Sequence, residues 1–353
     1  MLYKKNQILL VVALLLPAPL MSMRVITTDY SCDSFIGSNN SVFSLCPLTT
    51  TSFLAGTADG FINIFDITIN GVYTLIPGRK GYWADLNPEP LSRFKGHQAE
   101  VSSLALWGNQ GFVSGSLDRS ICLWQQADGE YYPTQTLGGN SSSIVSIFPF
   151  NTNDLIALTA NGDILIWSSD KAREPAKAFQ SSIGKISSMI KVNSNIFIMG
   201  GENCHIMICF LDTKELKTLA TYKLSQGLPV RALVACSNTC IAAFKDHIAV
   251  IAIPQNPSEQ YTIKQVILTN NSHPILAALH DDKFASVEQS TNTVLGVHAY
   301  DIKIWAKNEE GEYKCSRTLS GHRSKISSII QLESGHIVSA ALNGSIIIWE
   351  NLL

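Results

Sequence analysis

The sequence contains little charge. Only 15% of its 353 residues are Asp, Glu, Lys or Arg, and the formal net charge is −2, whereas about a quarter of the residues are charged in an average soluble domain. This composition excludes a long acidic or basic tail, a coiled coil and a disordered activation segment. The 26 basic residues are spread along the chain rather than gathered in one block. Nucleic acid is therefore not an expected partner.

Motifs for metal binding and catalysis are also missing. None of the eight cysteines belongs to a Cys-x-x-Cys pair, so zinc and thioredoxin-like chemistry have no motif. The sequence has no phosphate-binding loop and no paired metal-ligand histidines. His280-Asp281-Asp282 offers ligand atoms, but it falls where a hairpin should turn, which makes a solvated turn the simpler interpretation. The sequence predicts no catalytic residue, no metal and no cofactor.

Residues 1–22 are set aside as a possible signal peptide. Lys4 and Lys5 precede the apolar run Ile8–Leu16, which is typical of a secretory signal and too short for a stable membrane span. The run lacks a good cleavage site, and Met21 or Met23 offers an alternative start. Lone cysteines elsewhere favour a reducing compartment. Two locations stay open: secreted or periplasmic if the leader is genuine, and cytoplasmic otherwise.

Cys236 and Cys240 flank a predicted hairpin turn. Their side chains are candidates for cross-strand neighbours, and in an exported protein a disulfide between them is conceivable. The simpler interpretation is two small apolar residues on adjacent strands, because tight hairpins often miss disulfide geometry. The sequence leaves both open.

What the chain does contain is an internal repeat with a period of about 43 residues. Each copy opens with two apolar residues three positions apart and ends in an Ile- and Val-rich hairpin. Some of these hairpins carry the Asp-Gly or Asn-Gly pairs that tight turns favour. Outside the leader, no region shows the 3.6-residue period of a helix. The seven copies lie near residues 41–67, 96–125, 139–168, 182–210, 226–253, 271–306 and 321–350.

Two positions recur in every copy: a turn position, and a closing position six residues later. The turn positions are Asp59, Asp118, Asn161, Asn203, Asp246, Ala299 and Asn343. The closing positions are Phe65, Trp124, Trp167, Cys209, Ala252, Trp305 and Trp349. Two insertions, Thr68–Glu89 and Glu288–Ala299, interrupt the spacing.

At this point the chain resembles the WD-repeat family over residues 24–353. The family pattern of Gly-His, then Ser and Asp, then Trp is matched in one copy, and matched in another with Asn in place of Asp. The first set is His97, Ser114, Asp118 and Trp124, and the second is His322, Ser339, Asn343 and Trp349. Read alone, Ser114 with His97 and Asp118 has the composition of a nucleophile, a base and an acid. The resemblance instead implies a structural tetrad that links the strands of one blade.

The resemblance also implies the fold. Seven four-stranded repeats predict an all-β, seven-bladed WD-repeat β-propeller, formed as a single domain by residues 23–353. The last copy lacks a fourth strand, and Arg24–Thr28 is an alternating stretch with no other role. We therefore expect the N-terminal strand to complete the last blade and close the ring.

For function, the sequence favours a non-enzymatic interaction scaffold, a monomeric propeller within a complex, that binds a protein or peptide on one face of the disc. By resemblance, that face carries the residues just before the turn positions. These are Ala58, Leu117, Ala160, Glu202, Lys245, His298 and Leu342. The first insertion adds Arg79, Tyr82 and Trp83, which are residue types enriched at binding hot spots. The same aromatic residues are equally compatible with a flap that folds back onto the rim.

Two alternatives belong to other functional classes. One is a small-ligand binder or an enzyme with its site at the central channel. Convergent carboxylates or histidines at equivalent positions of several blades would favour it, and the sequence shows none. The other is a structural subunit of an exported assembly.

Overall fold

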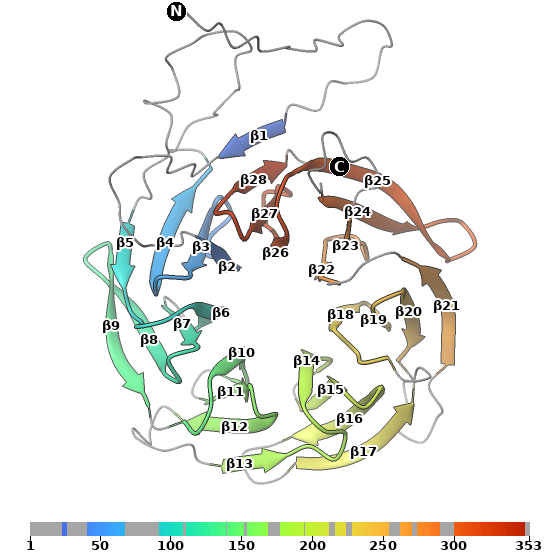
Figure 1. Cartoon of the computed structure of the whole chain (residues 1–353), viewed down its shortest axis with the longest axis horizontal. Coiled ribbons are helices and arrows are strands. Elements are labelled where there is room, and N and C mark those ends of the chain that lie inside the picture. Colours follow the sequence, from blue (N-terminus) through green and yellow to red (C-terminus); the bar gives the residue numbers. More distant parts are fainter. Residues whose placement is uncertain are drawn as a thin grey trace, which may run out of the picture.

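The chain forms seven four-stranded antiparallel sheets arranged in a ring (Figure 1). The structure is a computed structural model, and it describes residues 23–26, 41–67, 92–108, 111–138, 140–151, 154–168, 177–193, 195–211, 216–223, 228–253, 262–269, 274–289 and 300–349. These residues are strands, turns and short connections. The predicted all-β, seven-bladed β-propeller is confirmed. No helix in the described ranges is long and apolar enough to cross a membrane.

Each blade runs from an inner strand near the ring axis to an outer strand at the rim (Figure 1). Blade 1 contains β2 (Val42–Pro47), β3 (Ser52–Thr57), β4 (Phe61–Asp66) and β5 (Ser92–Lys95). Blade 2 contains β6 (Val101–Trp107), β7 (Gly111–Ser116), β8 (Ile121–Ala127) and β9 (Glu130–Leu137). Blade 3 contains β10 (Ile144–Pro149), β11 (Asp154–Thr159), β12 (Asp163–Ser168) and β13 (Lys177–Gln180).

The remaining blades follow the same order. Blade 4 contains β14 (Ile186–Lys191), β15 (Ile196–Gly201), β16 (His205–Leu211) and β17 (Leu216–Lys223). Blade 5 contains β18 (Ala232–Cys236), β19 (Thr239–Ala243), β20 (His247–Ala252) and β21 (Thr262–Leu268). Blade 6 contains β22 (Leu276–Ala278), β23 (Phe284–Gln289), β24 (Tyr300–Lys307) and β25 (Tyr313–His322). Blade 7 contains β26 (Ile326–Gln331), β27 (Ile337–Ala341), β28 (Ile346–Trp349) and β1 (Met23–Ile26).

The hydrophobic core lies between neighbouring blades. One buried cluster joins Leu54 and Ile62 of blade 1 to Leu104 and Trp124 of blade 2, and similar clusters occur around the ring. A blade is one sheet thick, so both of its faces must be covered by the blades on either side. This explains why second strands such as β3, β7 and β11 are buried at every residue instead of alternating.

Consecutive serines on three inner strands connect one blade to the next. In blade 2, Ser102 Oγ donates to the carbonyl oxygen of Ile144 in blade 3 (2.6 Å), and Ser103 Oγ accepts from the Ile147 amide (3.0 Å). Blades 4 and 7 repeat this arrangement toward blades 5 and 1 through Ser187–Ser188 and Ser327–Ser328. These serine pairs satisfy backbone groups at three blade interfaces that would otherwise be buried without partners.

The N-terminal strand lies beside the last blade. β1 pairs antiparallel with β28, with Met23 opposite Trp349 and Ile26 opposite Ile346. The sequence placed this strand at Arg24–Thr28, and the described strand begins one residue earlier. That the pairing is what holds the ring closed stays a prediction.

One closing position was assigned wrongly. In blade 2, Trp124 pairs with Phe112, and the equivalent pair in blade 5 is Ile251 with Cys240. Ile251 is fully buried, whereas the expected Ala252 is only half-buried at the strand end. The cause is a turn between β19 and β20 that is one residue shorter than the corresponding turn in blade 2.

Cys236 and Cys240 lie on opposite faces of blade 5. Cys236 pairs with Thr239 and Cys240 with Ala235, and cross-strand partners share a face while consecutive residues alternate. Cys236 packs toward blade 6, and Cys240 belongs to the cluster shared with blade 4. Both thiols are free, and burial raises the pKa of Cys236 to about 11 and of Cys240 to about 12.

Candidate functional site

The candidate site is the face of the disc that carries the turns between the second and third strands. The residue before the turn position donates its amide to the residue that precedes the first strand of its own blade: Leu117 to Glu100 (3.0 Å), and Glu202 to Lys185 (3.0 Å). Ala58, Ala160 and Leu342 make the equivalent bond. The turns and the loops leading into the blades therefore share one face, which we call the turn face.

In blade 2 the turn is anchored by a chain of buried side-chain hydrogen bonds. Trp124 Nε1 donates to Ser114 Oγ (2.9 Å), which lies 2.7 Å from His97 Nε2. The Asp118 carboxylate can only accept, so His97 Nδ1 carries the proton and donates to Oδ2 (3.2 Å), and Nε2 of the neutral ring accepts from the Ser114 hydroxyl. The four predicted residues are in contact from the core to the turn face.

Asp118 lies at the end of this series of hydrogen bonds and fixes the conformation of the turn. Its carboxylate also accepts from the backbone amides of Gln98 (2.8 Å) and Ser120 (2.9 Å). Burial raises the pKa of Asp118, but hydrogen bonds from the Ser120 hydroxyl and from these two amides lower it by more, so the pKa lies below its ordinary value. Burial of the imidazole lowers the pKa of His97, and this effect is larger than the opposite effect of the nearby Asp118 carboxylate. The neighbouring Leu117 is thereby held at a defined place on the turn face.

The serine–histidine–aspartate order resembles a hydrolytic triad, but the surroundings differ. Ser114 has no exposed surface, and its oxygen is bonded to both the indole and the imidazole. A nucleophile needs a free approach for its substrate. This geometry supports a structural link rather than acyl transfer.

Blade 7 has a weaker version of the same chain. Trp349 Nε1 donates to Ser339 Oγ (2.8 Å), which lies 2.7 Å from His322 Nε2. Asn343 reaches the imidazole only through Ser345, whose hydroxyl contacts Asn343 Oδ1 (2.8 Å) and His322 Nδ1 (3.3 Å). Without a carboxylate, burial lowers the pKa of His322 to about 4, so this histidine is neutral at pH 7.

Blade 3 keeps the tryptophan but not the serine. Trp167 pairs with Leu155 in the register that Trp124 has with Phe112. Ala157 stands where the serine would be, and the buried Nε1 of Trp167 has no hydrogen-bond partner among the described residues. In blade 6 the serine is present, and Trp305 donates to Ser286 (2.9 Å).

The surface of the turn face is mixed in character. Leu117 is 40% exposed, and Glu202 and Lys245 are exposed as well. Glu202 lies 3.8 Å from Lys185, an exposed ion pair that contributes little to stability. Arg79, Tyr82, Trp83 and His298 fall outside the described residues.

Two residues of this surface were missed in the sequence. Val145 is 37% exposed at the start of β10, and Ser143 just before it donates to the carbonyl oxygen of Leu117 (2.9 Å). Arg231 is exposed at the same end of blade 5, and its amide donates to Ala243. Exposure at equivalent repeat positions depends on how neighbouring loops pack, so the sequence alone gave no signal for either residue.

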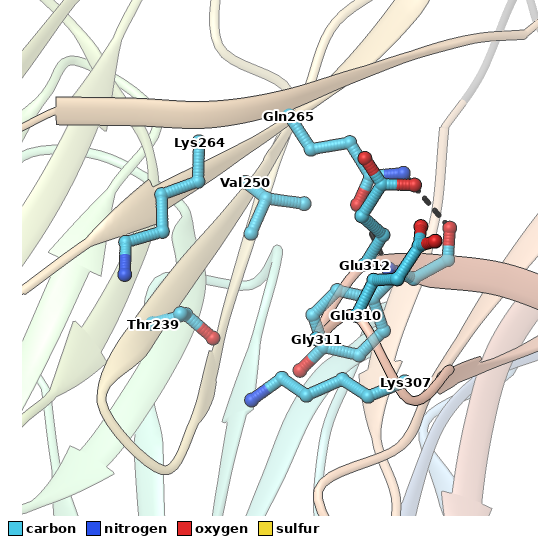
Figure 2. A pocket seen from close by; sticks show the side chains of 9 residues that line it. Thr239, Val250, Lys264, Gln265, Lys307, Glu310, Gly311 and Glu312 are labelled. Atoms are coloured by element: carbon cyan, nitrogen blue, oxygen red, sulfur yellow. Dashed lines mark hydrogen bonds between the residues drawn. The ribbon is translucent and has the colours of Figure 1, made fainter.

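A hollow of about 220 Å³ lies away from the ring axis, between blades 5 and 6. It is lined in part by Lys264, Lys307, Glu310 and Glu312, and Figure 2 shows the ammonium groups on one side and the carboxylates on the other. The described residues contain no cluster of three histidine, cysteine or carboxylate side chains suited to a metal ion.

Seven four-stranded sheets in a ring define the structural class as a seven-bladed β-propeller. The family model described as WD domain, G-beta repeat matches residues 88–125 and 313–350, the two segments that contain the hydrogen-bonded chains of blades 2 and 7. The chain is thus a seven-bladed β-propeller that carries WD repeats in blades 2 and 7.

Comparison with solved structures supports the same fold. The β-propeller domain of Cps50 (Swd1) from Myceliophteria thermophila matches with a TM-score of 0.68 and 14% sequence identity, covering 94% of this chain and 100% of that domain. At this identity the likeness shows the fold alone. A search of curated proteins finds no match.

The first prediction concerns the two tetrads. Asp118→Ala should lower the free energy of unfolding by about 2–3 kcal/mol, because the buried imidazole and two turn amides lose their acceptor. Asn343→Ala should cost less, about 1 kcal/mol, since Ser345 still contacts His322. Urea unfolding of the three proteins measures both changes. Equal stability of wild type and Asp118→Ala would show that the carboxylate does not anchor the blade.

The second prediction concerns blade 3. Ala157→Ser should raise stability by about 1 kcal/mol, because the new hydroxyl gives the Trp167 N–H an acceptor. Ala242→Ser is the matched control: Ala242 occupies the same register in blade 5, where no tryptophan faces it. There the buried hydroxyl should destabilise. Thermal unfolding distinguishes the two, and a loss of stability in both variants would refute the proposed pairing.

Proposed function

We propose that this WD-repeat propeller is a non-enzymatic scaffold that binds a protein or peptide partner on its turn face. WD-repeat propellers are typically protein-interaction scaffolds. The observation that carries the proposal is an apolar pair of exposed side chains, Leu117 on the blade 2 turn and Val145 at the start of β10, where Ser143 donates to the Leu117 carbonyl oxygen. Apolar side chains on a rigid scaffold lose little conformational freedom on binding, which favours affinity.

Charges around this pair suit a polypeptide partner. Lys185, Arg231 and Lys245 lie on the turn face together with Glu202 and Asp246. Both signs are interspersed, whereas a phosphate backbone would require a surface of one sign. An extended segment with apolar and acidic side chains fits the apolar pair and the exposed Arg231.

The first insertion is a second candidate binding element. Arg79, Tyr82 and Trp83 interrupt the repeat and are not needed to complete a blade, since blade 1 has four strands without them. They stay a proposal based on residue type, because aromatic and arginine side chains dominate binding hot spots.

The third prediction tests the turn face directly. A photo-crosslinking amino acid at position 117, used in cells of the native host, should capture a partner that the same amino acid at position 132 on the rim does not. Leu117→Glu with Val145→Glu should then reduce affinity for that partner at least about thirtyfold, because the apolar contacts are lost and two carboxylates would be buried without partners.

The control is Tyr132→Glu, a change at a side chain that is 49% exposed on the outer strand of blade 2. It should leave capture unchanged, and all variants should melt within a degree or two of wild type. If the double variant binds normally while Tyr82→Ala with Trp83→Ala abolishes binding, the insertion rather than the turn face is the site.

A further inference from the structure

The outer strand of blade 5 exposes an unusual amount of apolar surface. In β21, the exposed fractions are 48% for Ile263, 55% for Val266 and 84% for Leu268. The other exposed large apolar side chains of the described residues are single residues on other strands and loops. An exposed apolar edge strand is a ready template for pairing with another chain.

Outer strands of the other blades carry protecting charges. Their charged residues are Arg93 and Lys95 in β5, Glu130 in β9, Lys177 in β13, Lys217 and Lys223 in β17, and Lys314 and Arg317 in β25. In β21 the only charge is Lys264, and the following residues Gln265–Leu268 have none. Edge charges oppose sheet-to-sheet association, and β21 combines a single charge with three exposed large apolar side chains, which no other described outer strand does.

The backbone of this edge also offers unpaired groups. Thr269 donates its amide to Asp246, and the register places Leu268 opposite His247 and Val266 opposite Ala249. Because hydrogen-bonded and non-hydrogen-bonded pairs alternate in an antiparallel ladder, the amide and carbonyl groups of Val266 and Leu268 point away from β20. Among the described residues, no strand pairs with β21 on that side.

Contacts with blade 6 hold β21 in place. Ile267 is buried against blade 6, and the Gln265 side chain makes two 2.8 Å hydrogen bonds with the backbone of Tyr313. The exposed edge is therefore presented in a fixed conformation, which lowers the entropic cost of pairing.

From these observations we propose that β21 pairs antiparallel with β21 of a second copy of this chain. A two-fold axis at Ile267 places Val266 opposite Leu268 of the second copy, and Leu268 opposite Val266 of the second copy. Both apolar pairs are then covered, and the outward amides and carbonyls gain partners. The two blades form one continuous sheet, so the chain is a dimer rather than the monomer expected from the sequence.

Charge beside the edge favours a second copy over an unrelated partner. Lys264 and Lys307 line one side of the neighbouring hollow, and Glu310 and Glu312 line the other (Figure 2). A partner of one sign would be repelled by half of this lining. A two-fold interface presents the same surface from both sides, so a surface with both signs can complement itself.

Sedimentation of the full chain over a range of concentrations tests the proposal. The weight-average mass should rise from one chain to two. Val266→Lys with Leu268→Lys should remain monomeric, because like charges would lie opposite each other. Tyr132→Lys on the outer strand of blade 2 is the matched control and should dimerise as wild type does.

A charge-swap experiment makes the result specific to the edge. Val266→Glu with Leu268→Glu should also be monomeric alone, and mixing it with the lysine variant should restore the mass of two chains. Circular dichroism confirms that each variant is folded. The proposal would be overturned if the wild type stays monomeric at every concentration, or if the lysine variant dimerises as well as the wild type. This holds even if the β21 edge binds another peptide.

Discussion

Burial between blades is the interaction on which the rest of this molecule depends. Each blade is a single sheet with two apolar faces, so it is stable only when a neighbour covers each face. The clusters that join Leu54 to Trp124, or Ile206 to Ala242, are contacts between blades. The serine pairs reinforce this burial at three interfaces by satisfying backbone groups of the next blade. The interface between blades 5 and 6 instead uses Gln265 and the backbone of Tyr313.

This ring gives the turn face its rigidity. In blade 2 the hydrogen-bonded chain begins at a buried indole and ends at Asp118, beside the exposed Leu117. The polar residues of this repeat thus connect the core to a surface. Under the proposed function, specificity depends on the few side chains that the turns expose, and these differ from blade to blade.

The sequence predicted the blades because the repeat is enforced by packing at every copy. It failed where a turn differs in length between blades. At Ala252, a turn one residue shorter moves Ile251 into the buried closing position. It left the Cys236–Cys240 question open because only the strand register shows that the two side chains point to opposite faces. Val145, Arg231 and the edge of β21 could not be predicted, since the same apolar or charged residue is buried or exposed according to its neighbours.

Closure of the ring is the central claim, and hydrogen exchange tests it most directly. Chains lacking residues 1–22 and residues 1–28 differ in whether β1 can pair with β28. If β1 closes the ring, the amides of Ile346–Trp349 should exchange faster in the shorter chain, and its melting temperature should fall by several degrees. Identical exchange and melting in the two chains would show that the ring closes without this strand.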